Sequence, residues 1–233
     1  MKLRVLEQIE PIEGKAVRTA CGYGCVRCGC NIVQYCELSH DTLAQNRFLA
    51  CPECLKVLRG LVKDPPVLER VIKHPIAIQP EFNRKGLSYL GGMRLPDILL
   101  PGGIVLHSTP IPVVLNGYPI LRVDMPEVSG GPFQLTLRLN GMDGQIFKIV
   151  DQNLWRGNDE WRFERIGDAY FIENAISADR INFGIHGGSE IEIYELQACG
   201  GERRLTINSS GIDVDGAPFI FQKTSDRMVG ISA

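Results

Sequence analysis

The sequence lacks several features that mark common classes of protein. No apolar run approaches the roughly 18–20 residues that a membrane-spanning helix needs. The first 18 residues carry acidic side chains where a signal peptide would have its apolar segment. These absences predict a cytoplasmic protein with no membrane association. The chain also has no phosphate-binding loop, dinucleotide fingerprint or nucleophile elbow, so nothing indicates the enzyme classes that those motifs mark.

An excess of charge is also missing. The net charge is −2, so no global field attracts the molecule to nucleic acid or to an anionic membrane. The charges are nevertheless uneven. Residues 1–74 hold 11 Lys and Arg against 8 Asp and Glu, and the remainder holds 14 against 19. The mildly basic N-terminal part permits contact with nucleic acid there.

Cysteine is nearly absent from most of the chain and concentrated in one stretch. Of eight cysteines, seven lie between Cys21 and Cys54, and only Cys199 lies elsewhere. In a reducing compartment such a cluster predicts metal binding rather than disulfide bonds. Of the four histidines, three have no partners at ligand spacing: His74, His107 and His186.

Two Cys-x-x-Cys pairs are present, Cys25/Cys28 and Cys51/Cys54, with 22 residues between them. Thiolates are soft ligands that suit Zn²⁺ in tetrahedral geometry, and two intervening residues let both ends of a tight turn reach one ion. The gap between the pairs leaves room for a β-hairpin. The pattern therefore predicts a structural zinc ion held by these four cysteines.

The second pair opens the segment CPECLKVLRGLV, in which Leu55, Leu58 and Val62 share one helix face. A knuckle and a hairpin followed by a helix that carries the last ligands is a treble clef (ββα). The sequence thus predicts a zinc-binding treble clef over residues 1–63.

Three further cysteines leave alternatives open. Cys30 could replace Cys28 as a ligand. Cys21, Cys30 and Cys36 could instead be small apolar fillers of the core, or they could hold a second metal.

The rest of the chain divides in two. Residues 64–110 predict a short Pro-initiated helix followed by a Gly- and Pro-rich connector with little regular structure. Residues 111–233 alternate apolar and polar residues in short runs, and Asn-Gly or Asp-Gly separates apolar runs three times, which is typical of tight hairpins. The fold class predicted is α+β: the treble clef followed by a mainly antiparallel all-β domain, a sandwich or roll, with a β-solenoid as the alternative.

The cysteine region resembles the HNH endonuclease family, specifically a bacterial subgroup. The matching motifs are RTACGYGCVRCG (18–29), NRFLACPEC (46–54), RGLV (59–62) and VLERVIKHP (67–75). The resemblance covers about residues 15–80 and concerns the scaffold, which it implies to be a treble clef.

The resemblance departs from the family at the catalytic positions. The family mechanism implies a His general base at the end of the first hairpin strand and a divalent cation held partly by a His or Asn on the helix. The base should fall near residue 37, where Cys36-Glu37 stands, and Leu55 occupies the expected helix position. Asn46 is kept, and its family role is to brace the loop. These departures predict a scaffold that has lost its nuclease activity.

An alternative keeps the activity. If the first strand were three residues longer, His40 would be the base and Asp41 a neighbouring ligand of Mg²⁺ or Mn²⁺. Only five residues would then separate His40 from Asn46, so an exposed turn histidine is the favoured interpretation of His40.

Two further groups could bind partners. The cations nearest the knuckles are candidates for phosphate contacts, although solvated cations are commoner: Arg27, Arg47, Lys56 and Arg59. In the segment DQNLWRGNDEWRF, three residues could form a recognition surface, or the two indoles could fill the end of a sandwich: Trp155, Arg156 and Trp161.

Three functions remain open from the sequence. The favoured one is a zinc-stabilised accessory factor of a bacterial or phage system that binds nucleic acid or another protein. The alternatives are an active metal-dependent HNH endonuclease that uses His40, and a structural assembly protein.

Overall fold

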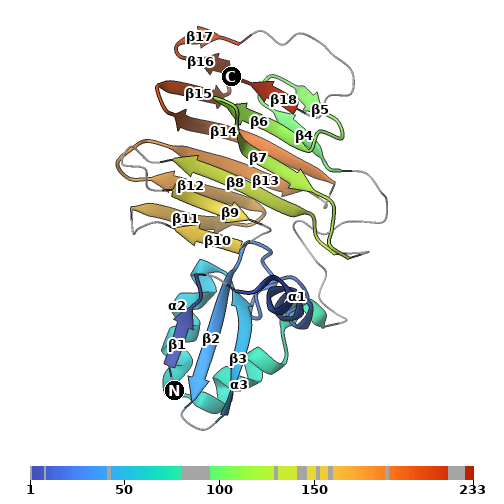
Figure 1. Ribbon diagram of the computed structural model, residues 1–233, viewed down its shortest axis with the longest axis vertical. Helices are drawn as coiled ribbons and strands as arrows, with labels where there is room; N and C mark the ends of the chain where they lie inside the picture. The colour runs from blue at the N-terminus through green and yellow to red at the C-terminus, as the bar shows by residue number, and fades with distance from the viewer. Residues whose placement is uncertain are drawn as a thin grey trace. The chain divides into compact units, whose positions relative to one another are not determined.

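The computed structural model divides the chain into two compact units (Figure 1). The first comprises Met1–Arg84 and Gln152–Trp155, and the second comprises Lys85–Asp151 and Arg156–Ala233. Most sheet neighbours in both units are antiparallel and helices are few, so the predicted α+β class with mainly antiparallel strands is confirmed. The structure describes residues 2–7, 9–40, 43–79, 95–128, 131–140, 146–150, 153–156, 160–186, 189–219 and 229–233.

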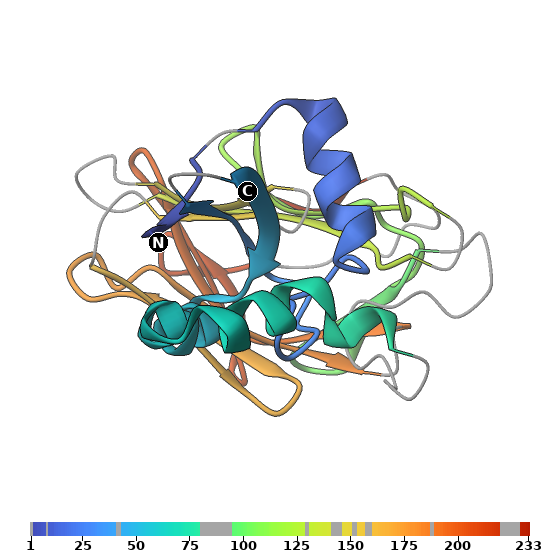
Figure 2. The ribbon, with the colours of Figure 1, turned by 90° about the horizontal axis from the view of Figure 1, so that it is seen from below.

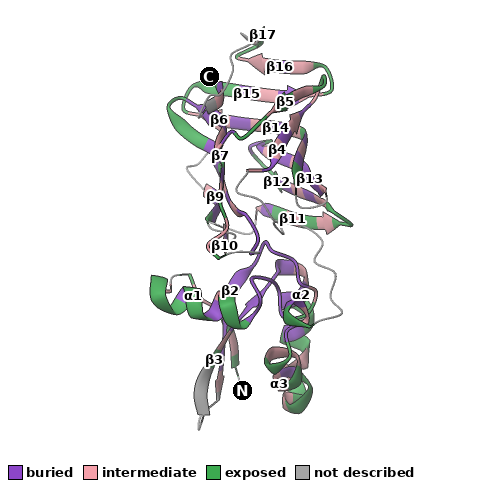
Figure 3. Cartoon of the chain, turned by 90° about the vertical axis from the view of Figure 1, so that its right-hand side faces the viewer, coloured by how far each residue is buried: buried purple, intermediate pink, exposed green. Residues whose placement is uncertain are grey.

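The first unit is built on a three-stranded antiparallel sheet in the order β1-β2-β3. One helix, α1, lies on one side of this sheet, and α2, η1 and α3 follow one another on the other side (Figure 2, Figure 3). The elements are β1 (Lys2–Val5), α1 (Pro11–Ala20), β2 (Gln34–His40), β3 (Leu43–Ala50), α2 (Pro52–Gly60), η1 (Leu61–Lys63), α3 (Pro65–Lys73) and η2 (Ile76–Ile78).

Proline begins each of the three α-helices of the first unit: Pro11, Pro52 and Pro65. A proline is well suited to the first helical position because the N–H that it lacks would have no partner inside the helix. The short helix expected after Asp64 is present as α3.

Residues 34–38 of the central strand β2 are all buried. Because successive side chains point to opposite sides of a strand, both faces of β2 are covered. On the α1 side, the Tyr35 hydroxyl donates a hydrogen bond to the carbonyl oxygen of Gly14 (3.5 Å). The opposite side is covered by α2 and α3, whose Leu58 and Leu68 have no exposed surface. The unit therefore has three layers, with the small sheet between α1 and the other helices.

A short piece of the second half of the chain also belongs to the first unit. Strand β10 (Asn153–Arg156) forms a parallel bridge from Asn153 to Val33. The Leu154 amide donates to the Val33 carbonyl (2.6 Å), and Gln34 Nε2 donates to the Leu154 carbonyl (3.4 Å). Leu154 is almost fully buried, so these residues are part of the packing beside the start of β2.

The second unit contains two sheets that pack face to face (Figure 3). In one sheet the strands run in the order β9-β8-β7-β6-β18, and in the other β11-β12-β13-β14-β15-β16-β17, with β4 and β5 beside part of β14. The bounds are β4 (Asp97–Leu100), β5 (Ile104–Leu106), β6 (Ile111–Leu115), β7 (Tyr118–Asp124), β8 (Gln134–Asn140), β9 (Ile146–Val150), β11 (Trp161–Ile166), β12 (Ala169–Asn174), β13 (Arg180–His186), β14 (Glu190–Gly200), β15 (Arg203–Asn208), β16 (Gly211–Val214), β17 (Ala217–Pro218) and β18 (Val229–Ser232).

Two of the predicted hairpin turns are confirmed. Asn116-Gly117 joins β6 to β7 and Asp215-Gly216 joins β16 to β17, and all four residues have positive φ. Positive φ at both corner positions suits the right-handed twist of paired strands, and Asn, Asp and Gly tolerate it best. Gly141 of the third predicted turn lies outside the described residues.

Part of the predicted connector is in fact regular structure. The strands β4 and β5 form a hairpin, and β4 also runs parallel to β14, with Ile98 opposite Ile191. Between them Gly102 and Gly103 have φ of 81° and 77°. The apolar runs on either side of this glycine turn are too short to be recognised as strands from the sequence alone. They form strands because residues 190–192 of β14 supply backbone partners for β4.

Candidate metal centre

The first knuckle is shaped by the loop that follows α1. The Cys25 amide donates to the Cys30 carbonyl (2.8 Å), and the Gly29 amide donates to the Cys25 carbonyl (2.8 Å). Gly29 has φ of 71°, and a Cβ on Gly24 would lie 2.7 Å from the Gly29 carbonyl oxygen. Glycine is therefore required at both positions for the tight turn that holds Cys25 and Cys28 side by side.

The second knuckle is the N-terminus of α2. Cys51 is the N-cap residue, and its sulfur accepts a hydrogen bond from the Cys54 amide (3.5 Å). The two knuckles meet because the Val26 amide donates to the carbonyl of Leu49, near the end of β3 (2.9 Å). The hairpin β2–β3 thus carries the chain from one cysteine pair to the other.

The four sulfur atoms of Cys25, Cys28, Cys51 and Cys54 lie within 4.8 Å of one another. Ligands about 2.3 Å from a tetrahedral zinc ion would be roughly 3.8 Å apart, and the Cys28 and Cys51 sulfurs are 3.7 Å apart. No other such group of three or more His, Cys, Asp or Glu side chains occurs among the described residues. The four cysteines that the sequence singled out therefore lie close together, in an arrangement compatible with a structural metal such as zinc.

Burial and mutual contact distort the acidity of these thiols. Hydrogen bonds from Cys28, Cys51 and Cys54 lower the pKa of Cys25. Contact with Cys25 in turn raises the pKa of Cys28 and of Cys51. Negative charge is therefore readily held at Cys25 and opposed at Cys28 and Cys51, and a bound cation would stabilise thiolates at all four positions.

The remaining cysteines of the cluster are buried side chains outside this group of four. Burial raises the pKa of Cys21 to about 11 and that of Cys36 to about 12. The Cys30 thiol donates to the Ile32 carbonyl (3.5 Å), and the Cys36 thiol donates to the Gln34 carbonyl (3.7 Å). Such buried thiols behave as small apolar residues with a weak donor.

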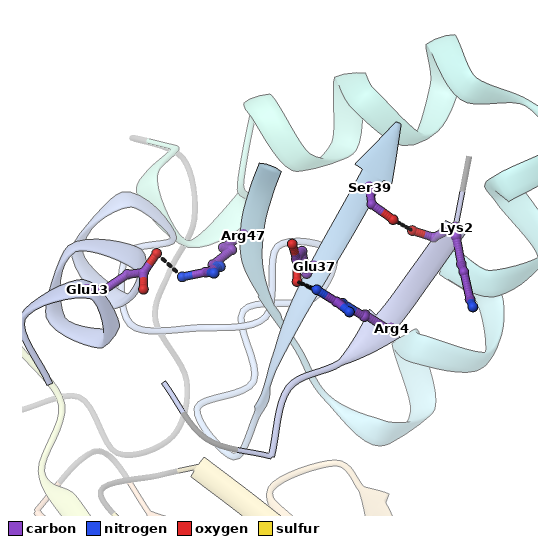
Figure 4. Close-up of polar contacts among 6 residues, drawn as sticks. All are labelled: Lys2, Arg4, Glu13, Glu37, Ser39 and Arg47. Carbon is purple, nitrogen blue, oxygen red and sulfur yellow. Dashed lines mark hydrogen bonds and ion pairs between the residues drawn. The ribbon is translucent and has the colours of Figure 1, made fainter. Parts of the chain in front are cut away.

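The four predicted phosphate-binding cations have different environments. Lys56 and Arg59 are exposed on α2, and Arg27 is exposed within the first knuckle. Arg27 Nη1 donates to the Cys54 sulfur (3.7 Å). Arg47 is only partly exposed and forms an ion pair with Glu13 of α1 (Figure 4). Three of the four cations are therefore exposed, and the fourth is paired with an acidic side chain.

The position expected for a catalytic base holds a buried carboxylate, which pairs with the exposed side chain of Arg4. Glu37 has no exposed surface, and its Oε2 accepts from Arg4 Nε (2.8 Å) and Nη2 (2.7 Å). In the strand register Glu37 stands between Arg4 of β1 and Arg47 of β3 (Figure 4). This carboxylate therefore lies in a row of charged residues across the sheet and is inaccessible to solvent.

The other positions assigned by the family resemblance also have definite places. The helix position, Leu55, is buried in α2. Asn46 is exposed on β3, opposite Leu38. His40 is the last residue of β2 and pairs with Leu43, and its side chain lies outside the described residues.

The two tryptophans have unlike surroundings. Trp161 has no exposed surface, and the centroid of its ring lies 5.3 Å from that of Phe147 in the facing sheet. It fills the core of the second unit. Trp155 is partly exposed, and the side chain of Arg156 lies outside the described residues.

Sequence reasoning missed the contribution of Asn153 and Leu154 to the first unit. The one local signal was the alternation of polar and apolar residues around Leu154, which predicts a strand without indicating its partner. It also missed Glu37 as a buried charge.

Comparison with protein-family models, with curated proteins and with solved structures finds no match for this chain. Among the described residues, no helix is both long enough and apolar enough to cross a membrane.

Proposed function

We propose that the first unit is a zinc-stabilised treble clef with the scaffold of an HNH endonuclease and without its catalytic centre. The observation that carries this proposal is the convergence of four cysteine sulfurs within 4.8 Å. Four sulfur donors with no oxygen donor favour a closed, structural zinc site. Such an ion would supply on the order of 10–16 kcal/mol of folding free energy.

The loss of nuclease activity is inferred from the two positions that the family resemblance assigns to chemistry. A general base must reach the water that it deprotonates, and Glu37 is fully buried against Arg4. A leucine at position 55 offers a metal no ligand atom. The resemblance therefore supports the scaffold, and these two side chains argue against the reaction.

What remains is a binding role, as an accessory factor that contacts nucleic acid or a partner protein. Lys56 and Arg59 are exposed on the same helix that supplies two of the cysteines. A zinc clamp would fix this helix in place, so that its cations reach phosphates at little further entropic cost. The second unit would serve as the scaffold of a second contact surface.

A salt titration tests the nucleic-acid role. The affinity of the full chain for a short duplex is measured by fluorescence anisotropy between 50 and 200 mM salt, in wild type and in the Lys56→Met/Arg59→Met double variant. Each lost phosphate contact should reduce the salt slope by about 1, so the double variant should lose about 2.

Lys15→Met is the matched control, because Lys15 is exposed on α1, on the other side of the sheet. An equal slope in the double variant and wild type would refute phosphate contact by α2. Absence of duplex binding altogether would favour a protein partner, and the molecular mass in solution would then test the assembly role.

A cleavage assay tests the loss of catalysis. Plasmid is incubated with the protein and Mg²⁺ or Mn²⁺, and we expect no nicking. Nicking that is abolished by His40→Ala would overturn the proposal and establish the alternative, an endonuclease that uses His40.

A further inference from the structure

Arg27 is the one charged residue inside the first knuckle, between Cys25 and Cys28. Its guanidinium reaches across to the second knuckle, where Nη1 donates to the Cys54 sulfur (3.7 Å). The side chain therefore bridges the two cysteine pairs. Its charge and its place beside the cysteines make it a candidate for phosphate contact in the sequence, but its observed partner is a sulfur.

The four sulfurs differ in what protects them. Cys25 is fully buried, and Cys51 is buried and accepts the Cys54 amide. Cys28 is the most exposed of the four, and Cys54, which is buried, is the one whose sulfur accepts the guanidinium. A cationic donor on this sulfur adds positive charge next to the ligand that α2 carries one turn in from its N-terminus.

The charge of the site gives this contact its importance. Four thiolates around one divalent cation carry a net charge of about −2, which makes the sulfurs susceptible to protons and competing metal ions. A guanidinium bonded to one of them offsets part of that charge. Donors to metal ligands are known to change metal affinity by roughly 10- to 100-fold.

We propose that Arg27 is a positioning residue of the metal centre: its guanidinium holds the Cys54 thiolate and retains the ion, and this role rests on the zinc site proposed above. The inference assigns Arg27 to the metal rather than to nucleic acid. The exposed cations of α2 are left to make any phosphate contacts.

Metal transfer to a chelator tests the assignment. Zinc content of the full-length proteins is measured first, and release to excess 4-(2-pyridylazo)resorcinol is then followed by absorbance. Arg27→Met keeps the aliphatic stem and removes the charge and the donors. It should release zinc about tenfold faster than wild type. Arg27→Lys keeps the charge and should lie between the two.

Lys63→Met is the control, because it removes one exposed cation near α2 and leaves Arg27 in place. It should release zinc at the wild-type rate. Equal rates in wild type, Arg27→Met and Arg27→Lys, each with one zinc per chain, would overturn the assignment and leave the zinc site intact. Wild-type protein that holds no zinc would instead overturn the site itself, and with it the role of Arg27.

A spectrum of the Co²⁺-substituted protein separates a bond to sulfur from a general effect on folding. A donor on the Cys54 sulfur stabilises its lone pairs and raises the energy of the thiolate-to-cobalt charge-transfer band. Arg27→Met should therefore shift this band to longer wavelength, and Lys63→Met should not. An unshifted band in folded, cobalt-loaded Arg27→Met would refute the contact.

Discussion

The two compact units use different means to hold a fold together. The first gathers seven of the eight cysteines around a three-stranded sheet, and its central strand buries a charged residue, Glu37. The interior of the second is lined by large apolar side chains such as Trp161, Phe147 and Phe183. A small unit has too little apolar surface to bury and gains most from a cross-linking ion. A larger one can rely on its core.

Loss of a cysteine ligand should produce the largest difference in stability between the two units. Cys51→Ser removes a proposed zinc ligand and keeps a side chain that can cap α2. The first unit should therefore lose most of the roughly 10–16 kcal/mol that a bound zinc ion would supply, and it should unfold. Hydrogen exchange should show lost protection in residues 9–79 and 153–155, and unchanged protection in residues 97–150 and 160–219. Cys199→Ser is the control. Equal protection in Cys51→Ser and wild type would show that both units stand on their apolar cores.

The converse change removes the largest core side chain of the second unit. Trp161→Ala leaves a cavity beside Phe147 and should destabilise this unit by about 3–5 kcal/mol. Chemical denaturation followed by circular dichroism, with and without a zinc chelator, measures the effect. The loss should be the same under both conditions. A loss that depends on the chelator would mean that the metal also supports the second unit.

Breaking the ion pair between the buried Glu37 and the exposed Arg4 should have a smaller effect. Arg4→Met leaves the Glu37 carboxylate buried without its donor, and this should cost about 2 kcal/mol. Glu37→Gln combined with Arg4→Met should recover part of the loss, because no buried charge remains. Additive losses in the double variant, measured by denaturation of the zinc-loaded protein, would show that the two side chains do not stabilise each other.

The smallest predicted effect concerns a buried carboxyl group of the second unit. Burial raises the pKa of Asp179, whose Oδ1 accepts the Cys199 amide (2.8 Å). Because the folded-state pKa is raised, the stabilisation is present below the unfolded pKa of about 3.9 and is lost as pH rises through the folded pKa. Asp179→Asn keeps the acceptor and removes the charge. It should therefore be more stable than wild type at pH 7, by less than about 1 kcal/mol.

The difference between Asp179→Asn and wild type should shrink as pH falls toward 4. Thermal melts of both proteins across this range measure it. A gap that widens on acidification would contradict the predicted sign, and it would mean that the charged form of Asp179 is the one that stabilises the fold.

The spacing of residues along the chain was enough to predict the local features. Cys25 and Cys28, like Cys51 and Cys54, are held close by two intervening residues, and the structure brings the two pairs together as expected. Asn116-Gly117 and Asp215-Gly216 turn because few other residues tolerate positive φ. These features depend on backbone geometry over two to four residues, so a local sequence pattern is enough to predict them.

Tertiary structure decided which partner each side chain meets. Arg47 contacts Glu13, Glu37 pairs with Arg4, and the Leu154 amide donates to the Val33 carbonyl, across separations that no local pattern encodes. In the same way the charge of Arg27 predicts a phosphate contact, and only the fold shows that its partner is the Cys54 sulfur. Short-range geometry follows from the allowed backbone torsions, whereas long-range contacts follow from how sheets and helices pack, which depends on the whole chain at once.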